Sequence, residues 1–379
     1  MNISPFLLAI LPALGILAWL GIIYRLWLSR PWKFRFRLEE SEKREEEPQV
    51  SVVIPARNEE DNIRGCLEDL LEQTYDNFEI IVVDDRSTDH TLERAREMSS
   101  GQDTVQVVEG AARPDNSWTG KSWAAWQGYR KAEGQYLLFV DADMGFDRRL
   151  LEGVVARQAG EENILFSLLP EQRLNGIFNK LLLPLHGLAI LTVFPLSLVN
   201  DPRSSRAIAV GGFMFFPRKL YELIGGHRVV RSRLAEDLAL STRVKEEGGG
   251  VDLKISGLLN TKPYSGGKET FLGLTKHLLA APFNPPLTIF VSQLCFILTH
   301  LVPLFLFLAG FNSLPLATMV GGLYFLIHLL MFVVYFQLPD STALFLLTFP
   351  ALLLYSAVNW LALYQSLVHG GPTWKGRRY

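Results

Sequence analysis

Polar side chains follow three of the apolar runs in the first half of the chain and could together form a ligand site. Pro55-Ala56-Arg57-Asn58-Glu59-Glu60 follows the first run, Asp84-Asp85-Arg86-Ser87-Thr88-Asp89 the second, and Asp141-Ala142-Asp143 a later one. Each set by itself fits a polar turn or a helix cap equally well. Because ligands of an open α/β sheet bind beyond the carboxyl ends of its strands, sets that follow successive strands indicate one site. We therefore predict ligand contacts from Pro55, Arg57, Glu59, Asp84 and Asp85.

Asp141 and Asp143 suit a metal ion. They stand two positions apart, so in an extended backbone their side chains project to the same side. Carboxylate oxygens are hard ligands, which favours Mg²⁺ or Mn²⁺ held jointly with a diphosphate. Such a metal neutralises charge on a departing diphosphate. We predict that Asp141 and Asp143 bind the metal and that Asp141 also contacts the ligand. The alternative, a pair of solvated carboxylates, is disfavoured because both directly follow a buried strand.

The segment Trp118–Ala124 (WTGKSWA) is a second candidate for phosphate binding and is expected to precede a helix. Gly120 and Lys121 would bring backbone N–H groups and an ammonium to a phosphate. A lone Gly-Lys pair is a weak signal and is not a P-loop. Further along, Arg228, Arg231 and Arg233 fit either a loop that closes over a diphosphate or a solvated basic loop. His227 and His277 have no recognisable partner in the sequence, so no role is predicted for them.

Short apolar runs alternate with helical patterns between residues 50 and 168 and would position these side chains. The runs at 51–54, 78–83, 104–108, 136–140 and 164–169 are almost continuously apolar, as strands buried on both faces of a parallel sheet are. Between the first two, Ile63, Cys66, Leu67, Leu70 and Leu71 form a helical stripe. This βαβαβ pattern predicts a Rossmann-like α/β domain that binds a nucleotide.

The 379 residues are 49% hydrophobic and 20% charged, with a mean hydropathy of +0.17, which is high for a wholly soluble protein. Four blocks carry no charge: 5–24, 286–310, 314–338 and 342–364. A helix of about 20 apolar residues spans the hydrocarbon core, so each block is long enough to cross a membrane. We predict an integral membrane protein with these parts: anchor 1–28, charged linker 29–49, α/β domain 50–260, connector 261–285, C-terminal helices 286–365 and basic tail 366–379.

Charge and cysteine content exclude several classes. A net charge of −2 and a pI near 6.4 argue against nucleic-acid binding. Cys66 and Cys295 form no disulfide framework and no metal cluster, which suits a reducing, cytoplasmic location. The first block lacks a basic n-region and is too long for the apolar part of a signal peptide, which favours a retained anchor.

Basic residues and prolines bear on the membrane topology. Arg25, Arg30, Lys33, Arg35 and Arg37 follow the first block, so the positive-inside rule places the next domain in the cytoplasm. The apolar segment 174–199 is broken by Pro184, Gly187 and Pro195, which favours interfacial helices over another span. Three C-terminal spans would put Lys375, Arg377 and Arg378 outside, against the rule. The number of spans and the side of the C-terminus stay open.

The stretches VSVVIPARNEE, IVVDDRSTDHT and LLFVDADMGF resemble the signatures of family 2 glycosyltransferases, which have the GT-A fold. The resemblance covers roughly residues 50–245. It implies that Asp84 and Asp85 hold the nucleoside and that Asp141-Ala142-Asp143 is the Asp-x-Asp motif for metal and sugar nucleotide. It also implies ligand-binding roles for Lys121, for Gly211-Gly212 near the acceptor and for Glu236, and a catalytic base at Asp237.

The assignment of a base to Asp237 also has a chemical reason. Inverting transfer needs one carboxylate to take the proton of the attacking hydroxyl while the bond to diphosphate breaks. Asp237 stands early in an expected amphipathic helix with Leu238, Leu240 and Val244, where the helix dipole favours its ionised form. The alternative is that Glu236 and Asp237 only decorate the beginning of this helix.

Within the family, the order of anchor, WTGKSWA, VNDPRSSRAIAVGGFMFF and three apolar blocks is similar to that of bacterial carotenoid glycosyltransferases and the hopanoid-associated glycosyltransferase. This similarity implies transfer of one sugar from a nucleotide-diphosphate sugar, expected to be a UDP-sugar, to a lipid in the bacterial cytoplasmic membrane. A carotenoid-like acceptor is expected first, and a hopanoid or polyprenyl phosphate second.

The main alternative is a processive polysaccharide synthase-translocator. The Gln-x-x-Arg-Trp motif of processive members is not present, and uncharged blocks argue against a polar channel. A sensor without activity would be expected to lose carboxylates that this chain retains. The donor sugar and the oligomeric state stay open.

Overall fold

The computed structural model describes residues 5–38, 47–115, 117–171, 174–262, 264, 266–279, 285–310, 313–336, 342–369, 373–374 and 377–378. Residues 39–46 of the predicted charged linker and Lys375 lie outside these residues. The chain forms two compact units. The α/β unit comprises Arg30–Arg173 and Leu196–Pro263, and the helical unit comprises Met1–Ser29, Leu174–Pro195 and Tyr264–Tyr379.

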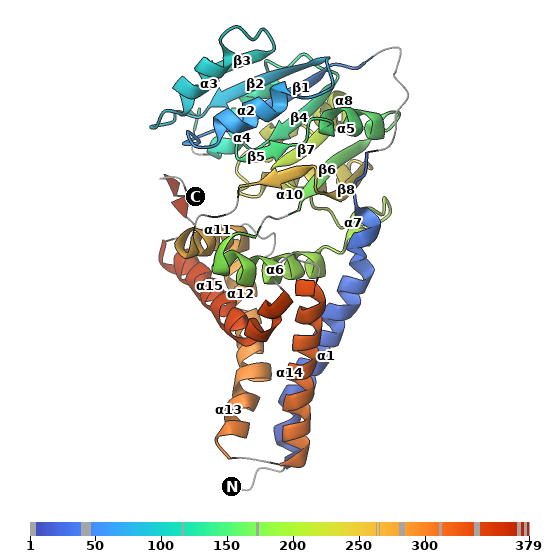
Figure 1. The fold of residues 1–379 in the computed structure, drawn as a ribbon, viewed down its shortest axis with the longest axis vertical. Coiled ribbons are helices and arrows are strands. Elements are labelled where there is room, and N and C mark those ends of the chain that lie inside the picture. The colour runs from blue at the N-terminus through green and yellow to red at the C-terminus, as the bar shows by residue number, and fades with distance from the viewer. Residues whose placement is uncertain are drawn as a thin grey trace. The chain divides into compact units, whose positions relative to one another are not determined.

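The α/β unit is built on a seven-stranded sheet in the order β3-β2-β1-β4-β7-β6-β8 (Figure 1). Its strands are β1 (Val50–Ala56), β2 (Phe78–Asp84), β3 (Val105–Glu109), β4 (Tyr136–Val140), β6 (Ile164–Pro170), β7 (Phe213–Pro217) and β8 (Gly250–Ser256). All five predicted strands are confirmed. β7 runs antiparallel between β4 and β6, so the sheet is mixed. β5 (Met144–Phe146), which directly follows the Asp-x-Asp segment, pairs with β9 (Leu259–Thr261) in a separate two-stranded sheet.

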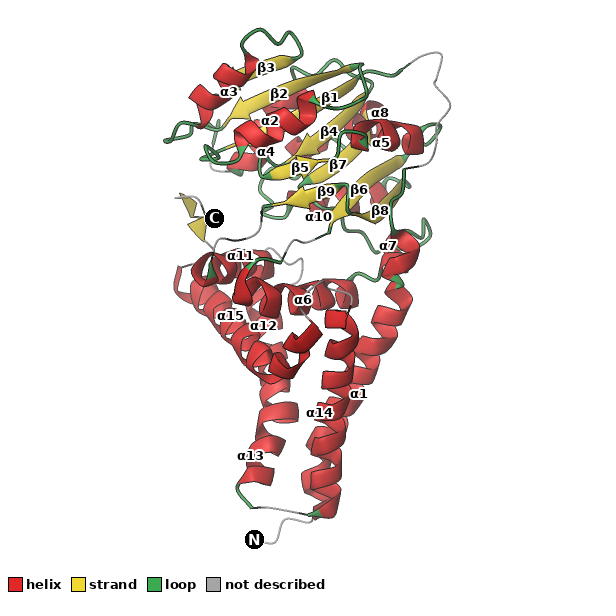
Figure 2. Ribbon diagram, viewed as in Figure 1, coloured by secondary structure: helices red, strands yellow, loops and turns green. Residues whose placement is uncertain are grey.

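Helices cover the sheet and explain why its strands are apolar throughout (Figure 2). They are α2 (Ile63–Leu71), α3 (Thr91–Ser99), α4 (Gly120–Tyr129), α5 (Leu150–Gln158), α7 (Leu196–Val199), α8 (Arg218–Leu223), α9 (Gly226–Val229) and α10 (Glu236–Glu246), with a 3₁₀ turn η1 at Pro31–Phe34. The predicted stripe on α2 is buried at Ile63, Cys66, Leu67 and Leu70. α4 packs closely on β1, since a Cβ at Gly128 would lie 2.4 Å from Val53 Cγ1.

The sheet opens between β1 and β4 at the carboxyl ends of these two strands. β1 pairs with β2 along its whole length, but with β4 only from Val50 to Val53. Pro55, which has no N–H to donate, stands in β1 beyond the last residue paired with β4. Such a point of divergence is where ligands bind in open α/β sheets.

The helical unit consists of α1 (Pro5–Ser29), α6 (Gly176–Val193), α11 (Gly267–Leu279), α12 (Pro285–Phe296), the π-turn η2 (Ile297–Leu301), α13 (Val302–Leu308), α14 (Leu314–Phe336), the 3₁₀ turn η3 (Thr342–Leu347), α15 (Thr348–His369) and a short pair β10 (Thr373–Trp374) and β11 (Arg377–Arg378). Five segments are long and apolar enough to cross a membrane: Ala9–Phe34, Gly176–Val193, Pro286–Leu308, Leu314–Phe336 and Thr342–Val368. Large apolar side chains such as Leu308 and Phe325 are 73% and 70% exposed, as expected of a surface that contacts lipid.

The segment that interrupts the α/β domain in sequence belongs to the helical unit. Leu174–Pro195 groups with the membrane helices rather than with the sheet. Its helix α6 contains Pro184 but continues through it. An interfacial position for α6 stays a prediction, because its length and composition also suit a span.

Candidate active site

A lysine ammonium between two carboxylates marks the centre of the candidate site. Lys121 Nζ lies 2.7 Å from Asp141 Oδ1 and 2.8 Å from Glu236 Oε1. Glu236 is 5% exposed, so it needs a partner of opposite charge. Although burial opposes it, the two carboxylates raise the pKa of Lys121 well above its usual range. Three predicted residues from β4, α4 and α10 therefore meet in one charged cluster.

Asp237 stands next to this cluster in a fixed orientation. Its Oδ2 accepts a hydrogen bond from Gly211 N (3.0 Å), and its Oδ1 accepts one from Leu238 N (2.7 Å). Burial, followed by the charge of Glu236, raises the pKa of Asp237 to about 6, while Lys121 and the two hydrogen bonds oppose the rise. A carboxyl group with this pKa is ionised at neutral pH and is still basic enough to accept a proton.

Side chains added at Gly211 or Gly212 would crowd the candidate site and displace its side chains. A Cβ at Gly211 would lie 2.9 Å from Lys121 Nζ and 3.1 Å from both Asp237 Oδ2 and Glu236 Oε1. A Cβ at Gly212 would lie 2.9 Å from Met144 Sδ. Any side chain at Gly211 would thus enter the space among the three charged groups.

Asp141 and Asp143 are presented by a turn, which corrects the expectation of extended backbone. Met144 N donates to Asp141 O (3.2 Å), and Asp143 immediately precedes β5. The two carboxylates lie near the buried thiol of Cys66, whose pKa is raised by burial and then by Asp143, Asp69, Asp141 and Glu59.

This acidic surrounding fits a divalent cation. Among the described residues, no three His, Cys, Asp or Glu side chains gather into a complete metal site. The donor set therefore suits a metal that takes its remaining ligands from a diphosphate, with Asp141 and Asp143 as the protein ligands.

The ends of β1 and β2 are joined by hydrogen bonds through Arg57. Its Nη1 donates to the carbonyl oxygens of Asp85 (2.6 Å) and Arg86 (2.8 Å). Asn58 and Arg86 have left-handed backbones, with φ of 51° and 56°, a conformation that is uncommon outside glycine and often found at functional sites.

Asp84 carries a buried oxygen that fits a ligand's donor group. The residue is 4% exposed, and its Oδ2 accepts from Ser87 N (3.1 Å). Its Oδ1 is buried and has no hydrogen-bond partner among the described residues. A buried carboxylate oxygen without a donor is costly, so this atom suits an N–H or O–H group of a bound nucleoside.

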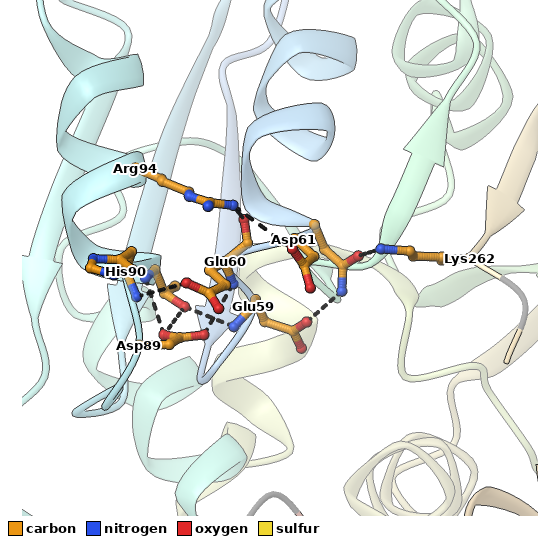
Figure 3. A network of polar contacts seen from close by, with 9 residues as sticks. Glu59, Glu60, Asp61, Asp89, His90, Arg94 and Lys262 are labelled. Carbon is orange, nitrogen blue, oxygen red and sulfur yellow. Dashed lines mark hydrogen bonds and ion pairs between the residues drawn. The ribbon is translucent and has the colours of Figure 1, made fainter. Parts of the chain in front are cut away.

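Glu59 belongs to a wider polar network around the β1–α2 and β2–α3 turns, which Figure 3 shows. Asn62 Nδ2 donates to Glu59 Oε2 (2.7 Å), and Lys262 Nζ donates to Asn62 Oδ1 (2.9 Å). Lys262 N also donates to Asp143 O (3.2 Å), so this lysine joins the two halves of the site. Lys262 was not among the predicted site residues, since it is about 120 residues from Asp143 and the pairing of β5 with β9 brings it close.

Gly120 and Arg231 were also singled out by the sequence, and both have defined places in the structure. Gly120 and Lys121 do not precede α4 but form its first turn, capped by Thr119 Oγ1, which accepts from Ser122 N (3.2 Å). Arg231 Nε donates to Ser117 Oγ (3.0 Å).

His227, expected to have no partner, is buried with its Nδ1 2.7 Å from Tyr221 OH. Burial and then the charge of Lys121 lower the pKa of His227 to about 3, so it stays neutral. His227 is therefore a buried, neutral residue near Lys121 with a structural role.

Comparison with known proteins shows which family and structures this chain is similar to. Residues 51–225 match the model of the family described as glycosyl transferase family 2. The 4,4'-diaponeurosporenoate glycosyltransferase of Staphylococcus haemolyticus is 28% identical over 261 residues, which are 64% of this chain and 65% of that protein. The enzyme of the same name from Staphylococcus aureus strain bovine RF122 / ET3-1 is 30% identical over 196 residues, 51% of this chain and 50% of that protein. The chain thus spans between half and two thirds of these curated relatives.

A solved structure shares the fold. It is a mannosyltransferase from Pyrobaculum calidifontis in complex with GDP-Man and Mn²⁺. It is 19% identical, with a TM-score of 0.63, and the match covers 96% of this chain and 99% of that one. The fold of this chain is therefore the GT-A fold that the sequence predicted.

Proposed function

We propose that this chain, which carries a family 2 glycosyltransferase domain of the GT-A fold, transfers one sugar from a nucleotide-diphosphate sugar to a membrane lipid. The observation that carries the proposal is the convergence of Lys121, Asp141, Glu236 and Asp237 around the backbone of Gly211. The cluster places Lys121 and Asp141, which could bind a diphosphate and its metal, beside Asp237, whose pKa of about 6 suits a general base.

In this proposal, Asp84, Asp85 and Arg57 hold the nucleoside, and Lys121 lies where its ammonium can contact the diphosphate. Asp141 and Asp143 would hold Mg²⁺ or Mn²⁺, which when bound supplies positive charge to a departing diphosphate. A UDP-sugar is proposed as donor, as the resemblance to family 2 glycosyltransferases implies.

Where the attacking group of the acceptor is a hydroxyl, Asp237 takes its proton. The backbone N–H groups of Gly211 and Leu238 hold both of its oxygens, which orients the carboxylate. Direct attack on the sugar by the acceptor is a single displacement, so the transfer inverts the configuration at the anomeric carbon.

The acceptor is proposed to be a carotenoid-like lipid, with a hopanoid or polyprenyl phosphate second. The curated relatives are named for a carotenoid carboxylate, and the chain carries five helices suited to a membrane. The basic residues after the first apolar block favour a cytoplasmic position of the α/β unit at a bacterial cytoplasmic membrane.

The test is nucleoside diphosphate release by the protein in mild detergent, with UDP-glucose and Mn²⁺, with and without a bacterial lipid extract. We expect release that depends on the extract and falls by roughly 10²–10⁴-fold in Asp237→Asn, with donor binding retained. Asp103→Asn, an exposed carboxylate in a turn, is the matched control. An ionised carboxylate acceptor has no proton to give, so its transfer should fall less than that to a hydroxyl.

Three outcomes would count against the proposal. Release that ignores the extract would indicate hydrolysis or polymerisation. Full turnover by Asp237→Asn with a hydroxyl acceptor would show that another group is the base. Absence of release with UDP-glucose would exclude that donor, and GDP-mannose would be tried next.

A further inference from the structure

The helical unit contains a row of four polar rings that the proposed chemistry does not use. His186 Nδ1 on α6 lies 3.1 Å from Tyr355 OH on α15, and the rings of His186 and His277 are 5.6 Å apart. His277 Nε2 on α11 lies 3.4 Å from Tyr264 OH. Figure 1 shows α6, α11 and α15 packed together. The sequence analysis found no partner for His277, and the structure corrects this.

The position of Tyr264 in the row is fixed by contacts with α6 and α11. Its ring lies against the backbone of α11 at Gly273, where a Cβ would be 2.4 Å from Tyr264 OH. Its carbonyl oxygen accepts from Asn179 Nδ2 (2.8 Å), and Asn179 Oδ1 accepts from Thr270 Oγ1 (2.7 Å). Asn179 and Thr270 are buried, at 2% and 0% exposed. The position of the ring is therefore set by α6 and α11 together.

Part of the row packs against an apolar cluster, which Tyr264 and Tyr355 contact, whereas His186 is half-buried and His277 is exposed. The cluster consists of Leu182, Leu183, Leu274 and Val358, with Leu174, Phe271, Leu278 and Leu354 packed against it. Polar groups in such surroundings cost free energy unless they are hydrogen-bonded, and in membrane proteins they are usually functional. Packing alone would be served by phenylalanine and leucine at these positions.

We propose that His186 and His277 bind the carboxylate at the end of a long-chain lipid, with Tyr264 and Tyr355 orienting the two imidazoles. This assignment rests on the proposed function, because it names the acceptor as a lipid acid. The lipid's hydrocarbon chain would contact the leucines of the cluster, and its two carboxylate oxygens would accept from the two rings.

The chemistry of the row favours a carboxylate over an uncharged group. Imidazole and phenol groups donate hydrogen bonds through N–H and O–H, and imidazole can also take a proton beside a negative charge. In the tautomer in which Tyr355 OH donates to His186 Nδ1, the ring proton is on Nε2, and this N–H can donate to a carboxylate. Two imidazoles 5.6 Å apart are both within reach of one carboxylate.

The experiment measures binding of parinaric acid, a fluorescent polyene fatty acid, to the full chain in nanodiscs. Its methyl ester and a long-chain alkyl phosphate serve as competitors. The variants are His186→Phe, His277→Phe and Tyr355→Phe, and the last of these keeps the ring and removes only the hydroxyl. His328→Phe is the matched control, because His328 is a histidine of the same unit whose Nδ1 contacts a carbonyl of its own helix (Tyr324 O, 2.8 Å).

We expect each histidine variant to weaken acid binding by about tenfold or more, the usual effect of losing a hydrogen bond to a charged group. Tyr355→Phe should have a smaller effect, and His328→Phe none. The methyl ester should compete poorly. Unchanged affinity in both histidine variants, or equal competition by the ester, would overturn the proposal. If the alkyl phosphate competes much more strongly than the acid, the assignment of a carboxylate ligand would be wrong and a phosphate lipid would be favoured.

Donor binding and nucleoside diphosphate release are measured on the same samples, so the two proposals fail separately. If the acid binds through the histidines but is not glycosylated, the lipid site stands and the acceptor assignment is wrong. If release is lost in every preparation while acid binding still depends on the histidines, the proposed transfer fails and the site does not.

Discussion

Replacing Glu236 by glutamine should shift the pH dependence of turnover to lower pH. Glu236 is the charged neighbour that, after burial, contributes most to the raised pKa of Asp237. Glutamine keeps the size of the side chain and an oxygen that can accept from Lys121 Nζ, which lies 2.8 Å from Glu236 Oε1. The substitution therefore removes one negative charge with little change in shape.

The size of the shift follows from the geometry around Gly211. Glu236 Oε1 and Asp237 Oδ2 each lie 3.1 Å from the same point, the position of a Cβ on Gly211. They are thus no more than about 6 Å apart, and at this distance two unit charges interact by roughly 3 kcal/mol at an effective dielectric constant of about 20, and by more at shorter range. Removing a neighbouring negative charge makes ionisation easier, so the pKa of Asp237 falls. Because Lys121 offsets part of the repulsion, we expect a fall of about one pH unit from its value of about 6.

The assay is kcat/KM for nucleoside diphosphate release between pH 4.5 and 8, with a hydroxyl acceptor or with water. The acid limb of the profile reports the ionisation of the base in the free enzyme. Glu246→Gln, an exposed residue at the other end of α10, is the matched control and should leave the limb in place. An acid limb that stays near pH 6 in Glu236→Gln, or moves to higher pH, would refute the assignment of Asp237 as the base.

Three further predictions concern the same site. Lys121→Met removes positive charge beside Asp237, so the acid limb should move to higher pH, opposite to Glu236→Gln, and the KM for donor should rise at least tenfold; a shift in the same direction would contradict the model. Gly211→Ala should lower kcat by about 10²-fold through displacement of the charged groups, with little loss of thermal stability, whereas Gly65→Ala, which has open space in α2, should be neutral. Asp143→Asn should raise the Mn²⁺ concentration for half-maximal turnover at least tenfold. The control Asp147→Asn, whose carboxylate accepts from Arg149 N, should not, and equal metal dependence of the two variants would exclude Asp143 as a ligand.

Much of the fold was predictable because it depends on local patterns. The five predicted strands and the helix at Ile63–Leu71 follow from apolar runs and a helical stripe within a few residues. The strand β7 was not predicted, although Phe213–Pro217 is apolar, and its antiparallel position between β4 and β6 depends on a connection that passes through the helical unit. No short window of sequence contains that information.

The amino-acid sequence by itself determined which groups can do chemistry and which segments suit a membrane. The carboxylates at the strand ends, the Gly-Gly pair and the uncharged blocks are visible as residue types at fixed spacing. Only the tertiary structure decided how these groups act on one another. Lys121 meets Asp141 and Glu236 across 20 and 115 positions of chain, and Lys262 reaches Asn62 across 200. The pKa of Asp237 and the row of rings from His186 to Tyr264 likewise arise from burial and from distances in space. Those quantities depend on which elements pack together, whereas a sequence pattern describes one element at a time.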